Sequence, residues 1–124
     1  MSTNRIYRIV SGGQTGADTL KVMAELFSSG LWDMNGVGIC VSSVTGNSPE
    51  PLDDELQTWQ DRFNEIPLDD NHDLIWLSVE EQETFDRDGE MLAKKLFDFF
   101  KGSKTILYRS TKGTETKFEG KLLP

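Results

Sequence analysis

Apolar residues are spaced along this chain in two ways, which together predict alternating strands and helices. Short runs of β-prone apolar residues at 6–10, 37–41, 74–79 and 105–108 predict strands. Apolar residues three and four positions apart within 20–27, 52–66 and 92–100 predict helices. Strands and helices in strict alternation are typical of an α/β domain, with a mainly parallel sheet of four or five strands and helices on both faces.

Individual segments refine this pattern. Leu74–Val79 is the most continuously apolar run, which predicts a central strand buried on both faces and a loop over Glu80–Gly89 at its carboxyl end. Pro51 and Pro67 suit the start and the end of the second helix. The tail at 110–124 is polar, and it either frays or adds an edge strand or a subunit contact.

A glycine-rich turn, Ser11–Asp18, joins the first predicted strand to the first predicted helix. Glycines let a ligand approach the backbone, and the first N–H groups of a helix attract anions, most often phosphate. The candidate ligand-binding residues here are Gly12, Gly13, Gln14, Thr15, Gly16 and Asp18. The segment lacks the third glycine of GxGxxG and the lysine of a P-loop. The alternative is a tight turn in which Thr15 caps the helix.

The segment Ile9–Asp18, with its core Gly-Gly-Gln-Thr-Gly-Ala-Asp, resembles the N-terminal sequence of the molybdenum cofactor carriers. These belong to a Rossmann-like superfamily (SLOG) that includes the lysine-decarboxylase-like proteins and the cytokinin-activating phosphoribohydrolases. The resemblance implies a three-layer Rossmann-like domain, usually a homo-oligomer. It also implies that the turn holds the phosphate of a nucleotide or of a molybdopterin-type cofactor.

Composition narrows the choice of partners and location. The length of 124 residues is that of one domain, 1–124. The net charge of −8 repels nucleic acid and anionic membranes, although a small anionic ligand can still bind at a helix start. With one cysteine, Cys40, and one histidine, His72, the sequence predicts no disulfide and no metal site. It shows no signal peptide or membrane-length apolar run, so we expect a cytoplasmic protein.

The loops expected after the later strands supply further candidate ligand-binding residues. In open α/β sheets ligands bind outside the carboxyl ends of strands. Ser43 lies in the small-residue loop 42–49, and Arg87 and Gly89 follow the predicted central strand. Arg87 could donate two hydrogen bonds to a phosphate, or merely pair with a neighbouring aspartate.

Three functions fit these observations. The first is a non-catalytic protein that carries, senses or sequesters a small phosphorylated ligand. The second is an enzyme that cleaves a nucleotide, with Asp18 or Glu90 as the general base or charge stabiliser. The third is a protein-interaction module without a ligand site.

Overall fold

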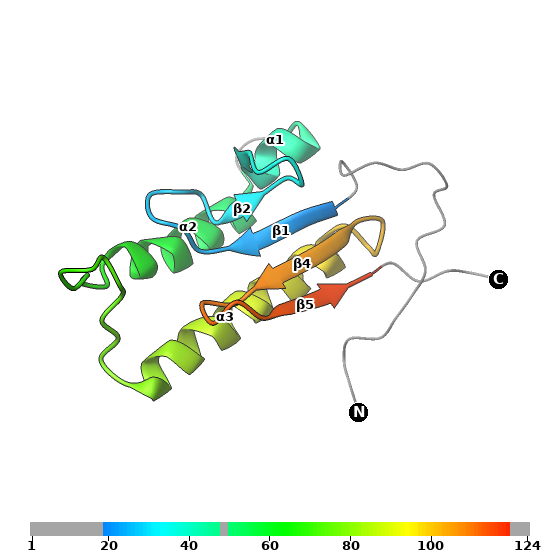
Figure 1. Cartoon of the computed structure of the whole chain (residues 1–124). Coiled ribbons are helices and arrows are strands. Elements are labelled where there is room, and N and C mark those ends of the chain that lie inside the picture. Colours follow the sequence, from blue (N-terminus) through cyan, green and yellow to red (C-terminus); the bar gives the residue numbers. More distant parts are fainter. Residues whose placement is uncertain (1–18, 48–49, 120–124) are drawn as a thin grey trace, which may run out of the picture.

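The computed structural model describes residues 19–47 and 50–119, and Figure 1 shows their arrangement. The strands are β1 (Thr19–Met23), β2 (Leu31–Trp32), β3 (Gly38–Ile39), β4 (Thr105–Arg109) and β5 (Glu115–Phe118). The helices are α1 (Val41–Thr45), α2 (Pro51–Asn64) and α3 (Val79–Phe99). The predicted strand at 6–10 and the glycine-rich turn lie outside the described residues.

The described strands form one mixed sheet in the order β3-β2-β1-β4-β5. Only β1 and β4 are parallel, while the other three neighbouring pairs are antiparallel. The prediction of a mainly parallel, three-layer Rossmann-like sheet is therefore wrong. Short turns follow β1 and β4, and a short turn between neighbouring strands forces antiparallel pairing. Only the long path from β1 to β4, which includes α2 and α3, permits a parallel pair.

The helices α2 and α3 lie side by side behind the sheet in Figure 1, so the described part of the chain has two main layers. Alternate strand residues face these helices and are buried, among them Leu20, Val22, Ile106, Tyr108 and Phe118. The strand residues between them, such as Lys21 and Lys117, point to the other side of the sheet, where no described helix lies. The prediction of helices on both faces is not met within residues 19–47 and 50–119.

The segment predicted as the first helix begins with β1 instead. Its buried positions, Leu20 and Val22, alternate with the partly exposed Lys21 and Met23, which is the period of a strand. Leu20, Met23 and Phe27 also satisfy a helical spacing, because so short a segment fits both periods. Phe27, which was expected in the apolar face of that helix, is 85% exposed in the turn after β1.

The run Leu74–Val79 is not a central strand. Leu74 and Trp76 pack against the core, whereas Ile75 and Leu77 point outward, with Leu77 90% exposed. The expected loop after this run is the first half of α3. The hydroxyl of Ser78 accepts a hydrogen bond from the N–H of Glu81 at 3.0 Å, and the carboxylate of Glu81 accepts one from the N–H of Leu77 at 2.6 Å. Paired bonds of this kind mark a helix start.

Other predicted elements are present in the structure in whole or in part. The helix expected from Pro51 is α2, which ends at Asn64, and the strand expected at 105–108 is β4. The predicted strand at 37–41 is reduced to the two residues of β3, since Val41 already begins α1. Within the tail, Glu115–Phe118 forms the edge strand β5.

Aromatic rings join the two layers. The ring of Trp59 on α2 stacks on Phe85 of α3 with centroids 4.7 Å apart and meets Tyr108 of β4 edge-on at 6.1 Å. The indole N–H of Trp59 also donates to the carbonyl of Phe85 at 3.0 Å. Trp59 therefore has both an apolar environment and a partner for its polar atom, as a buried tryptophan requires.

Candidate functional site

The residues predicted to bind a ligand do not form one site in the described structure. Gly12, Gly13, Gln14, Thr15, Gly16 and Asp18 lie outside the described residues. Ser43 is in the short helix α1, and its hydroxyl donates to the carbonyl of Cys40 at 2.6 Å. Arg87, Gly89 and Glu90 are in α3 rather than in a loop.

Of these residues, Arg87 and Glu90 line the same hollow between α3 and the β4–β5 hairpin, with a volume of about 290 Å³. Gly89 does not open onto it. Gly89 is buried, and a Cβ atom there would lie 2.5 Å from ring atoms of both Trp59 and Tyr108. Close packing of α3 therefore explains this glycine without a ligand.

The start of α1 is occupied by the protein's own carboxylate. The Oδ1 atom of Asp53 accepts from the N–H of Val41 at 2.5 Å, and its Oδ2 accepts from the N–H of Ser42 at 3.0 Å. Free N–H groups at a helix start would otherwise attract an anion. Asp53 thus caps α1 from the first turn of α2 and ties the two helices together.

A second carboxylate, that of the half-buried Asp86, fastens the β4–β5 turn to α3. Its Oδ1 accepts from the hydroxyl of Tyr108 at 2.7 Å and from the N–H of Thr111 at 2.9 Å, and its Oδ2 accepts from the hydroxyl of Thr111 at 2.7 Å. Burial, and then the hydrogen bond to Asp86, raise the pKa of Tyr108 far above its usual value. These groups satisfy one another, so the cluster is a structural junction.

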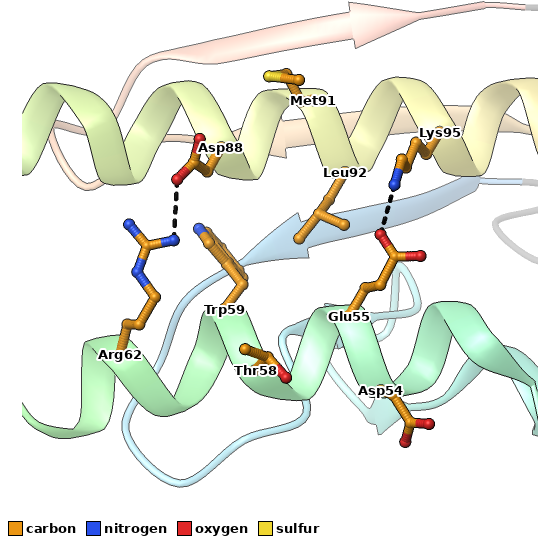
Figure 2. Close-up of a pocket in the computed structure, with 9 residues that line it drawn as sticks. All are labelled: Asp54, Glu55, Thr58, Trp59, Arg62, Asp88, Met91, Leu92 and Lys95. Atoms are coloured by element: carbon orange, nitrogen blue, oxygen red, sulfur yellow. Dashed lines mark hydrogen bonds and ion pairs between the residues drawn. The ribbon is translucent and has the colours of Figure 1, made fainter.

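A groove of about 390 Å³ runs between α2 and α3 (Figure 2). Trp59, Met91 and Leu92 supply its apolar surface. Two ion pairs cross it, Arg62 to Asp88 at 2.9 Å and Lys95 to Glu55 at 2.6 Å. All four charged side chains are about half exposed, so each pair contributes about 0–1 kcal/mol. We assign this groove to the packing of the two helices, since its charged groups already pair across it.

The connection from α2 to α3 has a different surface. Four large apolar side chains on it or beside it are exposed: Leu68 at 39%, Ile75 at 48%, Leu77 at 90% and Val79 at 63%. We call these four residues the apolar strip. Contiguous exposed apolar side chains rimmed by polar ones mark protein–protein contact sites. The sequence contained the signal, because Leu74–Leu77 is an unbroken apolar run, but burial on both faces was the wrong interpretation of it.

The chain segment that carries the apolar strip is strongly acidic. Between Arg62 and Arg87 the sequence has no lysine or arginine, and the exposed residues there include Glu65, Asp70, Asp73 and Glu80. We call these four residues the acidic rim. The strip and its rim belong to the segment from the end of α2 to the start of α3, which lies at one end of the described part of the chain in Figure 1.

A protein-family model described as Serratia CdiI immunity protein-like matches residues 18–111. The chain belongs to this family. No curated protein matches the chain. The match spans β1 to the end of β4, and so it includes the apolar strip and the acidic rim.

Family membership corrects the prediction from the motif Ile9–Asp18. The chain is not a molybdenum cofactor carrier or another member of the Rossmann-like SLOG superfamily, because the matched family is a different one. The same finding overturns both the carrier of a small phosphorylated ligand and the nucleotide-cleaving enzyme. The resemblance covered about ten residues, nearly all of them before the matched region. The prediction of a homo-oligomer was based on that resemblance alone, so it no longer has support.

Two further findings concern partners. Among the described residues no helix is both long enough and apolar enough to span a membrane. Within the same ranges, 19–47 and 50–119, no three histidine, cysteine or acidic side chains are grouped so that they could hold a metal ion.

Proposed function

We propose that this protein is an immunity protein that binds a protein toxin and thereby blocks the toxin's action. The observation that carries the proposal is the family match over residues 18–111. A protein of this kind needs a surface that recognises another protein, and it needs no catalytic group of its own. The exposed apolar strip with its acidic rim is a surface of this kind, which supports the proposal.

Binding can neutralise a toxin by covering its active surface or by holding it in an inactive form. A stable complex of this type usually buries about 1,200–2,000 Å² in total, which is within reach of a domain that exposes 7628 Å². The neutralising effect then depends on affinity and on a slow dissociation rate.

The experiment is bacterial co-expression of this chain with the protein toxins against which immunity proteins of this family protect. We expect growth to be restored with at least one of these toxins. We also expect the purified proteins to form a one-to-one complex by size-exclusion chromatography and calorimetry. An immunity protein of an unrelated family, expressed to the same level, is the control. Growth arrest with every toxin, or a complex that leaves the toxin active, would contradict the proposal.

A further inference from the structure

We propose that the toxin docks on the apolar strip, and that the docking surface of the toxin is basic with apolar side chains at its centre. This inference rests on the proposed function and specifies its binding surface. It depends on three properties of the strip and its rim: exposure, rigidity and charge.

Exposure is the first property. Leu77 is 90% exposed and Val79 63%, so most of their apolar surface lies in water. Burying such surface against a partner yields about 25 cal/mol per Å². Ile75, which is 48% exposed, adds a third exposed aliphatic side chain two residues before Leu77, whereas Trp76 between them packs against the core.

Rigidity is the second property, and it comes from contacts on the inner side of the connection. Trp76 packs on Phe85 with ring centroids 5.5 Å apart. The N–H of Ile75 donates to the carbonyl of Pro67 at 2.8 Å, and the N–H of Leu77 donates to Glu81. A backbone that is already fixed by such contacts loses little conformational freedom on binding, which favours affinity.

Charge is the third property, and it identifies the chemistry of the partner. Among the described residues no basic side chain forms an ion pair with Asp70, Asp73 or Glu80. These carboxylates are therefore available to Lys and Arg side chains of a partner. Such a rim accelerates encounter with a basic surface and disfavours an acidic one.

The same charge argues against other occupants of the strip. In a symmetric dimer formed through the strip, each acidic rim would face an identical acidic rim. A nucleic acid would bring phosphates against the carboxylates. A basic protein surface is the occupant that the rim attracts.

The apolar part of the proposal is tested with two matched substitutions in the full chain. Leu77→Arg places a charge in the strip, and Met91→Arg places one on α3, at a methionine that is 59% exposed. We expect Leu77→Arg to raise the Kd for the toxin that the wild-type chain neutralises by about tenfold or more. Met91→Arg is expected to change it by less than about threefold.

The charged part is tested with two double variants that alter the net charge equally. Asp70→Lys with Asp73→Lys cancels the formal negative charge of the four-residue rim. Asp61→Lys with Asp98→Lys makes the same change in net charge on α2 and α3. We expect the first pair to lower the association rate constant at low ionic strength by about tenfold, and the second by less than about threefold.

Circular dichroism and thermal unfolding establish that each variant is folded, which is expected because these side chains are exposed. Neutralisation by Leu77→Arg and by the rim variant at the wild-type affinity would overturn the docking surface and leave the proposed function standing. Absence of protection by the wild-type chain would overturn the proposed function and this inference with it.

Discussion

At Gly89, α3 packs closely against the rings of Trp59 and Tyr108. A methyl group at this position would lie 2.5 Å from a ring carbon of each, and 2.7 Å from the hydroxyl oxygen of Tyr108. Both rings are buried, so neither can move aside without disturbing the junction between helix and sheet.

Gly89→Ala is expected to destabilise the protein by about 1–3 kcal/mol, because overpacking outweighs the gain of about 1 kcal/mol in helix propensity. Thr84→Ala, at an exposed position of the same helix, is the control and is expected to be neutral or slightly stabilising. Urea denaturation monitored by tryptophan fluorescence measures both. Equal stability of Gly89→Ala and the wild type would show that the rings of Trp59 and Tyr108 can move aside at little cost.

Because of Tyr108, the stability of the folded state depends on pH in the alkaline range. Its folded pKa is raised by burial and by Asp86, so above about pH 10 the unfolded chain loses this proton while the folded chain keeps it. The contribution to stability is fully present below about pH 10 and is lost as the pH rises further.

Tyr108→Phe is expected to cost about 1 kcal/mol near pH 8, through the lost hydrogen bond to Asp86. Above about pH 10 the wild type should lose up to about 1.4 kcal/mol per pH unit relative to this variant. Urea titrations at several pH values measure the difference. Parallel pH profiles for the two proteins would contradict the assignment.

At the scale of elements, short segments were the hardest to predict. A five-residue segment satisfies the period of a strand and that of a helix alike, so pairing with β4 decided the conformation of β1. The helix α2 was predicted correctly because its apolar spacing continues through four turns and Pro51 marks its start. In α3 the helix start at Ser78 was missed because the apolar residues before it suggested a strand.

The contact between α1 and α2 depends on the carboxylate of Asp53. Asp53→Ala leaves the N–H groups of Val41 and Ser42 without this acceptor, so we expect a loss of about 1–2 kcal/mol. Asp54→Ala, in the same turn but exposed, is the matched control, since it removes an equal charge from the helix start. Thermal unfolding compares the two variants, and equal losses would show that Asp53 acts only through the helix dipole.

At the scale of the whole molecule, acidic residues are concentrated in one part of the sequence. Fifteen of the 21 acidic residues lie between Glu50 and Glu90, together with only two of the 13 basic residues. This segment contains α2, the connection and half of α3. Its field extends about 30 Å into solvent at 0.01 M ionic strength and about 8 Å at 0.15 M.

The association rate constant with the toxin is therefore expected to fall about tenfold or more between these two ionic strengths. The dissociation rate constant should change much less, since the apolar strip is insensitive to screening. Stopped-flow or surface-based kinetics measure both constants. An association rate that is independent of salt would contradict electrostatic attraction to a basic toxin surface.

The sequence alone determined the properties that depend on local spacing and composition: the helix α2, the strand β4, and the excess of acidic residues. Contacts between distant residues decided the rest. Pairing with β4 made β1 a strand, packing against Trp59 and Tyr108 made Gly89 a structural residue, and the anchoring of Trp76 on Phe85 turned Leu77 outward. An apolar residue has the same letter in a core and on a binding surface, and only its neighbours in space distinguish the two.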